Sequence, residues 1–403
     1  MTWISRTVLT ISLAAIPLFL YIGLRLAASF SSLRPNSRRT ARKVAVGVIL
    51  WLCLFPVLVW VQNALGMTRN RFDLVSGGAI IQYSVVYPYW IALIAAVELV
   101  APFLILDLAS AAIHLWPSHV VQWRRRLAVL RIVLAAGGLV FVSVKAYVDT
   151  SLVRDRVERI GISNLPRGLE GLHITLVADL QVDRYTGEEK ADQMRRIVDS
   201  SRPGLLMFAG DIVTGGTVCV GEAIAAMCSR RGSIGSFAVM GDHDYWSDPD
   251  SIMNGLRDCG WDFLLNKHRV VEYNGQRILI TGLTNIYSQR LNESRLDSIL
   301  ASAPQADLKI LLVHQPAQWL VERIAKYGYD LLLAGHTHGG QVVLHPFGIT
   351  LTPSMRETRY YSGSYRLGPM NIVVTNGIGL TLAPLRYCAP AEVTTVILEG
   401  AER

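Results

Sequence analysis

The chain has 403 residues, of which 51% are hydrophobic and only 17% are charged, and its mean hydropathy is +0.33. Soluble globular proteins carry roughly 25% charged residues, so the composition argues against an ordinary cytosolic enzyme and against a disordered chain. The net charge of +8 would suit nucleic-acid binding, but residues 1–150 carry +10 and residues 151–403 carry −2. The C-terminal part therefore lacks the basic surface that a nucleic-acid partner needs.

Four apolar stretches in the first 150 residues predict a transmembrane domain. They are Thr7–Leu24, Val44–Met67, Leu74–Val97 and Leu127–Val148. Only the last contains charged residues, Arg131 and Lys145, which lie near its ends, where long cationic side chains extend to the membrane interface. A helix of about 20 apolar residues crosses the hydrocarbon core. We therefore expect an N-terminal all-α bundle of four transmembrane helices over residues 1–150.

The distribution of basic residues predicts the orientation of this domain. Arg34, Arg38, Arg39, Arg42 and Lys43 lie between the first and second stretches, and Arg124–Arg126 lie between the third and fourth. By the positive-inside rule both loops are cytoplasmic, so everything after residue 150 lies outside the cytoplasm. This arrangement predicts an integral membrane protein whose C-terminal part lies outside the cytoplasm. If Leu74–Trp116 instead formed two spans divided at Pro88, the C-terminal part would lie in the cytoplasm. That arrangement would place Arg124–Arg126 outside the cytoplasm, so we prefer four spans.

Two acidic residues interrupt the apolar region after the third stretch. Glu98 and Asp107 would lie at or near membrane depth, where an ionisable side chain is costly and often functional. The alternative is that both lie near the end of a tilted helix, within reach of water. Neither is included among the candidate site residues.

The pattern changes after a linker over residues 151–170. Between 171 and 400, short apolar runs alternate with polar stretches of helical length, which is typical of a sheet covered by helices. Five of the apolar runs end directly in a candidate metal ligand, where open α/β sheets place their sites. The five runs lead into Asp179, Gly210-Asp211, Gly241-Asp242-His243-Asp244, His314, and Gly335-His336-Thr337-His338.

Carboxylates and imidazoles in this pattern suit divalent first-row metals better than a thiolate site would. The spacing His336-x-His338 is too short for one face of a helix, so in an extended or looping segment the two rings can reach different ions. Two ions about 3.5–4 Å apart can clamp a phosphoryl group and activate water. The glycines beside the ligands allow sharp turns and close approach to a bound group.

This set of motifs resembles the calcineurin-like metallophosphoesterase superfamily, with the signature D-x-H, G-D, G-N-H-D/E, a separate His, and G-H-x-H. Gly335–Gln341 (GHTHGGQ) and Thr375–Pro390 (TNGIGLTLAPLRYCAP) are similar to its membrane-associated bacterial phosphoesterases. The resemblance covers residues 170–400 and implies two packed mixed β-sheets flanked by helices, an αββα sandwich. It implies one ion held by Asp179, Asp211 and His338, and a second held by Asp211, Asp242, His314 and His336. His243 would contact the phosphate or leaving group and act as a general acid.

Two positions depart from the family pattern. Gln181 replaces the histidine of D-x-H as a candidate ligand, and Asp242 replaces the asparagine of G-N-H-D. Gln181 offers an oxygen where the family has an imidazole nitrogen, and Asp242 offers an anionic oxygen where the family has a neutral one. Both changes favour Mn²⁺ for the two divalent ions, with iron or Zn²⁺ as alternatives. The resulting hypothesis is a membrane-anchored, metal-dependent phosphoesterase acting on a monoester or diester, with a lipid-linked substrate as one candidate. The alternative is a degenerate membrane sensor that binds a phosphorylated ligand without turnover.

Other features leave their interpretation open. Cys53 lies in a predicted span, and Cys219, Cys228, Cys259 and Cys388 lie in the C-terminal domain without a C-x-x-C pair, so any disulfide pairing is open. Met355–Tyr365 (MRETRYYSGSY) is either a solvated loop or a contact for a phosphorylated lipid headgroup. The sequence decides neither the oligomeric state nor the natural substrate.

Overall fold

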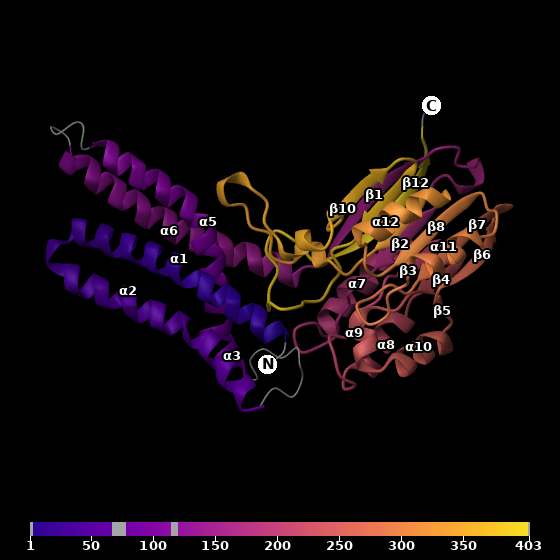
Figure 1. The fold of residues 1–403 in the computed structure, drawn as a ribbon, viewed down its shortest axis with the longest axis horizontal. Coiled ribbons are helices and arrows are strands. Elements are labelled where there is room, and N and C mark those ends of the chain that lie inside the picture. Colours follow the sequence, from indigo (N-terminus) through magenta and orange to yellow (C-terminus); the bar gives the residue numbers. More distant parts are fainter. Residues whose placement is uncertain (1–2, 67–77, 114–119, 402–403) are drawn as a thin grey trace. The chain divides into compact units, whose positions relative to one another are not determined.

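The computed structural model describes residues 3–66, 78–113 and 120–401, which divide into two compact units. We name them the helical unit (Met1–Tyr147, Val343–Leu351 and Leu382–Cys388) and the sheet unit (Val148–Val342, Thr352–Thr381 and Ala389–Arg403). In Figure 1 the helices of the first are indigo and purple, and the strands of the second run from magenta to yellow. Two short segments from the C-terminal half of the sequence thus belong to the helical unit.

Four apolar helices in the helical unit are long enough to cross a membrane, which confirms the four predicted spans. The elements are α1 (Trp3–Leu33), η1 (Pro35–Ser37), α2 (Arg38–Leu52), α3 (Leu54–Ala64), α4 (Ala79–Ile81), η2 (Gln82–Val86), α5 (Tyr87–Ala112) and α6 (Val120–Ser151). Ala79–Ala112 is one continuous helical span, which does not support a division at Pro88. The predicted residues Met67, 74–77 and Trp116 lie outside the described residues.

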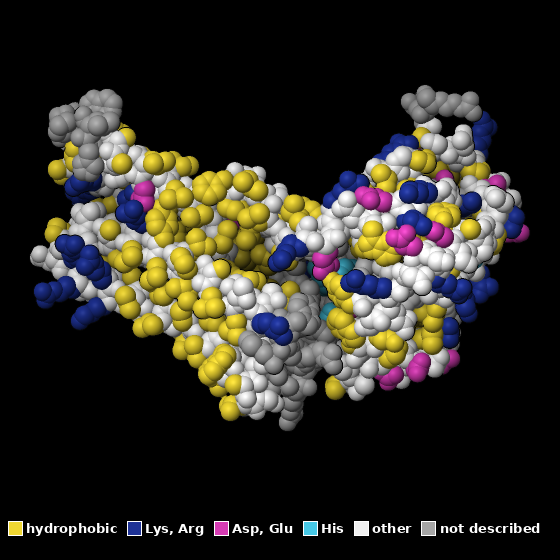
Figure 2. Space-filling view, in the orientation of Figure 1, with side chains coloured by type: hydrophobic (Ala, Val, Ile, Leu, Met, Phe, Trp, Pro, Cys, Tyr) yellow, Lys and Arg dark blue, Asp and Glu magenta, His cyan; other side chains and the backbone are white. Residues whose placement is uncertain are grey.

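The surface of the helical unit is largely apolar. Hydrophobic atoms cover much of its visible face in Figure 2, and Lys and Arg side chains gather at one end. Large apolar side chains point outward from every long helix, among them Leu13, Val57, Ile105, Leu108 and Phe141. Such a surface is unfavourable in water and suits lipid.

Asp107, one of the two acidic residues in the third apolar region, has protein partners inside this unit. These partners explain how an apolar helix accommodates its carboxylate. Its carboxylate accepts a hydrogen bond from the Tyr21 hydroxyl at 2.8 Å and pairs with Arg131 at 2.7 Å and Arg25 at 2.8 Å. These residues come from α1, α5 and α6, so the pairs join three helices. An ionised side chain within a bundle is stabilised by such partners.

The sheet unit contains two six-stranded sheets, in the orders β1-β12-β2-β3-β4-β5 and β10-β11-β9-β8-β7-β6. The strands of the first are β1 (Arg154–Ile162), β2 (His173–Val177), β3 (Leu205–Phe208), β4 (Gly235–Ala238), β5 (Asp262–Phe263) and β12 (Glu392–Gly400). Those of the second are β6 (Lys267–Tyr273), β7 (Gln276–Leu283), β8 (Leu308–Val313), β9 (Leu331–Ala334), β10 (Gly363–Leu367) and β11 (Met370–Val374). Both sheets mix parallel and antiparallel pairs.

Helices cover the outer face of each sheet. The α-helices are α7 (Glu188–Ser201), α8 (Val220–Cys228), α9 (Asp242–Ser247), α10 (Pro249–Asp258), α11 (Glu293–Ala301) and α12 (Gln318–Ile324). Short 3₁₀ turns are η5 (Arg167–Leu169), η6 (Ala325–Tyr327), η7 (His338–Gly340), η8 (Pro346–Gly348) and η9 (Pro353–Arg356). This is the predicted αββα sandwich, and it confirms the expected fold class.

The alternation of side chains along the strands builds three apolar layers. In β3, Leu205 and Met207 enter the cluster between the two sheets, whereas Leu206 and Phe208 enter the cluster beneath α7, α8 and α10. A third cluster packs the second sheet against α11 and α12. Because successive side chains of a strand point to opposite faces, a strand covered on both sides is apolar throughout. This explains the short unbroken apolar runs in the sequence.

The region read as a linker, residues 151–170, is corrected by the structure. Residues Arg154–Ile162 form the edge strand β1, paired in parallel with β12 from Arg154↔Glu392 to Ile162↔Gly400. Five of its nine residues are charged and only Ile160 and Ile162 are buried, which is expected of an edge strand and resembles a solvated linker in the sequence. The sheet unit therefore begins directly after α6.

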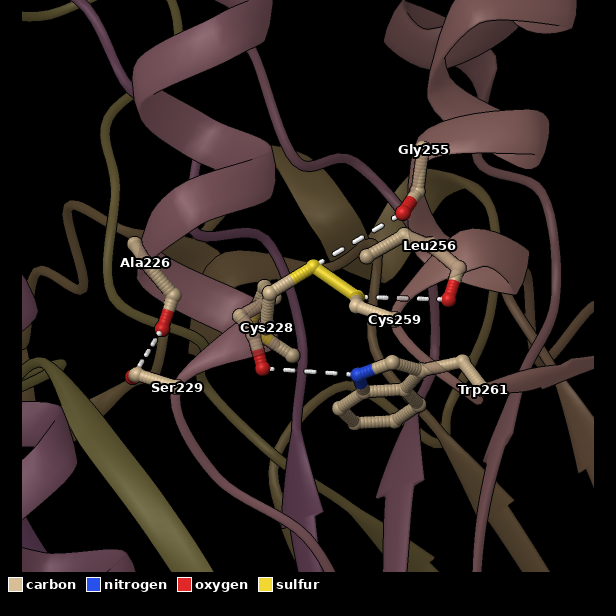
Figure 3. Close-up of a disulfide and its surroundings, with 8 residues drawn as sticks. Ala226, Cys228, Ser229, Gly255, Leu256, Cys259 and Trp261 are labelled. Carbon is tan, nitrogen blue, oxygen red and sulfur yellow. Dashed lines mark hydrogen bonds between the residues drawn. A yellow bond between two sulfur atoms is a disulfide. The ribbon is translucent and has the colours of Figure 1, made fainter.

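One disulfide joins Cys228, at the end of α8, to Cys259, which follows α10 (Figure 3). The two Cα atoms are 5.5 Å apart and the pair is separated by 31 residues. Trp261 packs beside it and donates an indole hydrogen bond to the carbonyl of Met227 at 3.3 Å. The bond ties together two helices on the outer face of the first sheet.

Candidate metal centre

The carboxyl ends of five strands carry the candidate ligands. Strands β2, β3 and β4 are parallel neighbours, and they lead into Asp179, Asp211 and Asp242. Strands β8 and β9 are parallel neighbours in the other sheet, and they lead into His314 and His336. Parallel strands place their carboxyl ends on one edge, so each sheet gathers its ligands there. Because each of these ligands follows a strand, the sequence pattern correctly indicated that they lie near one another.

Two groups of side chains have ligand atoms within 4.8 Å of one another. The first contains Asp242, His314 and His336, and the second contains Asp179, Asp211 and His314. His314 Nε2 lies 3.2 Å from Asp211 Oδ2 and 3.6 Å from Asp242 Oδ2. The two groups share His314, which gives the arrangement of a paired centre.

His338 and Gln181 lie beside the second group. His338 Nε2 is 3.7 Å from Asp179 Oδ1, and Gln181 Nε2 is 3.5 Å from Asp211 Oδ2. Among the described residues, Asp179 Oδ1 and Gln181 Oε1 are buried without a hydrogen-bond partner. A buried acceptor without a donor is costly, so an external cation fits between these oxygens. The structure thus brings together every residue proposed from the sequence as a ligand.

The histidine tautomers also fit a cation. His314 Nδ1 lies 2.7 Å from the carbonyl oxygen of Ala209, which can only accept, so Nδ1 carries the proton and the Nε2 lone pair faces the carboxylates. His336 Nδ1 approaches His314 Nε2 to 3.2 Å and Asp242 Oδ2 to 3.4 Å. Lone pairs and carboxylates at these distances repel one another unless a proton or a metal ion lies between them.

The electrostatics of the protein groups agree with this geometry. Burial alone would lower the pKa of His314, but the carboxylates of Asp211 and its neighbours raise that pKa well above its usual value. Burial raises the pKa of Asp179 to about 6, despite the nearby His314. Burial also acts to raise the pKa of Asp211, but His314 and His243 outweigh it and hold that pKa below its usual range. Without a metal ion, a second proton on His314, at Nε2, would supply part of the positive charge that these carboxylates need.

The backbone at the centre adopts a conformation that is unusual for these residue types. Asp179, Gln181, Asp211, His336 and His338 have φ of 49°, 43°, 61°, 71° and 51°. Side-chain-bearing residues rarely occupy this left-handed region, and they do so mainly where function requires it. Local propensity opposes these conformations, so the surrounding packing must hold them in place.

The TNGIG segment after β11 supports the first ligand loop. Backbone N–H groups of Ile378 and Gly379 donate to the carbonyl of Asp179 at 3.2 and 2.7 Å. A Cβ at Gly377 would lie 2.6 Å from Asp179 Cβ, and a Cβ at Gly379 would lie 2.5 Å from Gln181 Cβ. Both positions therefore require glycine, which gives this part of the family-like motif a physical role.

Asp244 supports the second and third ligand loops without reaching the ligand groups. Its carboxylate accepts backbone hydrogen bonds from Asp211 at 2.8 Å, Ile212 at 2.7 Å and Gly241 at 3.0 Å. It is fully buried, and burial raises its pKa to about 6. The residue fixes the Gly-Asp turn against the start of α9.

His243 lies at the rim of the centre, next to Asp211. Its backbone N–H donates to Asp211 Oδ1 at 2.8 Å, and its Nε2 lies 4.0 Å from Asp211 Oδ2. The ring Nδ1 donates to the carbonyl of Thr214, which leaves Nε2 to face the centre. The ring also packs against Trp246, with centroids 5.3 Å apart. The arrangement suits proton transfer to a group bound between the ligands.

Glu357 is a site residue that the sequence interpretation missed. It lies in the Met355–Tyr365 segment, and its Oε2 is 3.2 Å from His336 Nε2. It also accepts a hydrogen bond from the Tyr287 hydroxyl. The hydrogen bond from His336 lowers the pKa of Glu357, so the carboxylate is ionised and Nε2 carries the donated proton. The available signal for Glu357 in the sequence was an acidic residue between Arg356 and Arg359.

A pocket of about 220 Å³ adjoins the first group. Its lining includes His336, Glu357, Tyr287, Arg290 and Trp319. The Tyr287 N–H also donates to Asp242 Oδ1 at 2.7 Å, which connects the pocket wall to a candidate ligand. The pocket combines an arginine, aromatic rings and an edge of the centre, as a binding pocket for an organic phosphoester requires.

Comparison with known proteins identifies the class of this domain. Residues 172–340 match the family model for calcineurin-like phosphoesterases. Over these residues the chain is similar to the calcineurin-like phosphoesterases.

Curated relatives extend the similarity beyond residues 172–340. The chain is 27% identical over 258 residues to the uncharacterized metallophosphoesterase YkuE of Bacillus subtilis, covering 63% of this chain and 88% of the relative. It is 28% identical to an uncharacterized metallophosphoesterase of Aquifex aeolicus, covering 63% of this chain and 95% of the relative. It is also 26% identical to a transmembrane protein with metallophosphoesterase domain of Danio rerio, covering 60% of this chain and 56% of the relative. Membrane-associated relatives are therefore present.

Proposed function

We propose that the chain is a membrane-anchored, metal-dependent phosphoester hydrolase. The observation that carries this proposal is the pair of ligand groups sharing His314, with unpartnered buried oxygens on Asp179 and Gln181. Two divalent ions held there would polarise the phosphoryl oxygens and lower the pKa of an attacking water. The ligands would be Asp179, Gln181, Asp211 and His338 for one ion, and Asp211, Asp242, His314 and His336 for the other.

The side chains around the centre supply the remaining functions. His243 Nε2 faces the centre and would donate a proton to the leaving oxygen, since Nδ1 is held by the Thr214 carbonyl. Asp244 holds the loops of Asp211 and Gly241 in register through three backbone hydrogen bonds. Arg290 on the pocket wall would attract the anionic ester and orient its leaving group.

We propose Mn²⁺ as the preferred ion, with Fe or Zn²⁺ as the alternatives. The seven proposed ligands offer three carboxylates, one amide and three imidazoles, and Gln181 supplies an oxygen where the family pattern has a histidine. Oxygen-rich sets suit Mn²⁺, whereas additional imidazole or thiolate would favour Zn²⁺.

The sheet unit is proposed to lie outside the cytoplasm, anchored in a bacterial cell membrane. The basic loops around Arg38 and Arg125 support this orientation by the positive-inside rule. The Cys228–Cys259 disulfide supports it independently, because disulfides persist in oxidising compartments. A reporter fused after residue 160 tests this: activity of a cytoplasm-only reporter there would overturn the orientation.

A non-catalytic phosphate-ester sensor is the second candidate, and Gln181 is the observation that favours it. An amide is a weaker donor than imidazole, so the second group holds its ion less tightly. Gln181→His should raise the number of ions bound per chain, with exposed Gln318→His as the matched control. If wild-type and Gln181→His chains both bind metal and phosphate but neither hydrolyses an ester, the sensor is supported.

The hydrolase is tested on the full chain in detergent. Wild-type protein with added Mn²⁺ should hydrolyse p-nitrophenyl phosphate or bis(p-nitrophenyl) phosphate, and His336→Ala should abolish turnover. His268→Ala is the control, because its ring bonds Thr281 away from the centre. Equal rates for His336→Ala and wild type would contradict the proposal.

A further inference from the structure

The segment Val343–Leu351 follows the GHTHGGQ motif directly, yet it belongs to the helical unit. It is a hairpin: Leu344 and Leu351 exchange backbone hydrogen bonds of 2.9 and 2.8 Å around the turn η8. The second short segment of this unit supports it, since the Val343 N–H donates to the Tyr387 carbonyl at 2.9 Å. The hairpin is the orange-gold loop beside α5 in Figure 1.

Glu98 ties the hairpin to α5. Its carboxylate accepts the backbone N–H of His345 at 3.0 Å, which gives this acid a partner. The turn η8 also packs on α5. An acidic side chain in an apolar helix is costly, so a donor brought to it by another segment stabilises both. The structure thus explains Glu98 by a contact within the helical unit.

The contact lies at membrane depth. The neighbouring Leu99 packs against Gly138 of α6, where a Cβ would be 3.1 Å from Leu99 Cδ2. Gly138 is central in the apolar stretch Leu127–Val148, so each end of that stretch is about 15 Å away along the helix. A hydrocarbon core is about 30 Å thick. If α5 and α6 cross a bilayer, the hairpin contact with Glu98 would lie at the level of the acyl chains.

Apart from the imidazole of His345, the exposed side chains of the hairpin are apolar. Phe347 is 61% exposed, Ile349 is 60% exposed and Leu351 is 47% exposed. The hairpin contains no Asp, Glu, Lys or Arg. Burying three such side chains in lipid is favourable, whereas their joint exposure to water is unfavourable.

The backbone of the hairpin also suits an apolar surrounding. Non-helical backbone is tolerated at membrane depth only where its polar groups have partners. Six of its eight N–H groups donate to protein acceptors, and Pro346 has no N–H to satisfy. The six donors are Val343, Leu344, His345, Gly348, Ile349 and Leu351.

We propose that Val343–Leu351 is a re-entrant hairpin whose apolar side chains lie in the acyl layer of the bilayer beside α5. His338 is five residues before Val343, so covalent geometry keeps the candidate ligand within about 18 Å of the hairpin. Resting on the proposed hydrolase, the consequence is that the substrate is a phosphoester carried on a membrane lipid, with its headgroup presented at the membrane surface.

The hairpin is tested with spin labels on the full chain in phosphatidylcholine–phosphatidylglycerol vesicles. Phe347→Cys and Ile349→Cys are labelled in a background in which Cys53, Cys219 and Cys388 are serine and the disulfide is retained. Both labels should be accessible to oxygen and shielded from a water-soluble nickel complex, as for Leu108→Cys on α5. Val218→Cys, 95% exposed on the sheet unit, should show the reverse.

Three results would overturn the hairpin proposal. Nickel accessibility at 347 and 349 equal to that at 218 would place the hairpin in water. Shielding from both reagents with spin–spin broadening would show that a second copy of the chain covers it, and shielding without broadening would show another protein partner.

The lipid-substrate consequence has a separate readout. Phe347→Ser/Ile349→Ser should hydrolyse p-nitrophenyl esters at wild-type rates but lose at least tenfold on vesicles containing phosphatidic acid or phosphatidylglycerol. An unchanged ratio of the two rates would overturn the lipid substrate. If wild-type protein hydrolyses neither the p-nitrophenyl esters nor the phospholipids, the proposed hydrolase function is wrong. The spin-label accessibilities then still test whether the hairpin lies in the bilayer.

Discussion

Glu357 Oε2 lies 3.2 Å from His336 Nε2, on the edge of the imidazole opposite to Nδ1, which is 3.4 Å from Asp242 Oδ2. A carboxylate that accepts the second ring proton of a ligating histidine fixes its tautomer and raises its basicity. Glu357 therefore positions His336 for metal binding. The Tyr287 hydroxyl donates to the same carboxylate and holds it in place.

Glu357→Gln should weaken Mn²⁺ binding about 10- to 100-fold, because the uncharged amide no longer stabilises a positively polarised imidazole. Equilibrium dialysis with mass-spectrometric metal analysis measures this effect directly. Glu322→Gln, an exposed glutamate of α12, is the matched control and should leave affinity unchanged. Wild-type affinity in the Glu357 variant would show that its contact with His336 is only structural.

His243→Gln should lower kcat about 10²- to 10⁴-fold while leaving the bound metal unchanged, because it removes a proton donor and no ligand. The loss should be smaller for p-nitrophenyl esters, whose leaving group needs little protonation, than for alkyl esters. His173→Gln serves as the control outside the centre. Equal losses on both leaving groups would argue against a general-acid role.

Stability of the metal-free chain should fall as pH rises from about 4 to 8. Burial raises the pKa of Asp179 and of Asp244 to about 6, so these groups bind more protons in the folded state and lose this advantage on deprotonation. The raised pKa of His314 acts in the same direction, with its stabilisation lost as pH rises through the folded-state pKa. The lowered pKa of Asp211 affects stability only at more acidic pH.

Metal ions bind the deprotonated ligands, so added Mn²⁺ should raise the Tm more at pH 7.5 than at pH 5. Thermal unfolding in detergent, with chelator or with Mn²⁺, measures both trends. A metal-induced shift that is larger at pH 5 would contradict the assigned protonation states.

Cys228→Ser/Cys259→Ser should lower the free energy of unfolding by about 3–4 kcal/mol, the loop-closure value for 31 residues. Denaturant unfolding under oxidising and reducing conditions measures the difference. Reductant should destabilise the wild type to the level of the double variant and leave that variant unaffected. Cys219→Ser, which removes a free thiol, should change little.

The sequence predicted those features that depend on short-range pattern. The apolar stretches revealed the four spans by length, and the strand-end motifs located the ligands because parallel strands share an edge. The same logic missed β1, whose many charged residues resemble a solvated linker. It also missed Glu357 and the hairpin at 343–351, since both depend on contacts between segments far apart in the chain.

Asp211 is the residue on which the account depends most, because it reaches His314, Gln181 and the backbone of His243. The most direct test measures bound metal and ester hydrolysis in the same preparation of wild type and Asp211→Asn. The account predicts two ions and Mn²⁺-dependent turnover for wild type, and fewer ions with no turnover for Asp211→Asn. Wild-type turnover that persists in Asp211→Asn, or in chelator-treated protein stripped of metal, would contradict it.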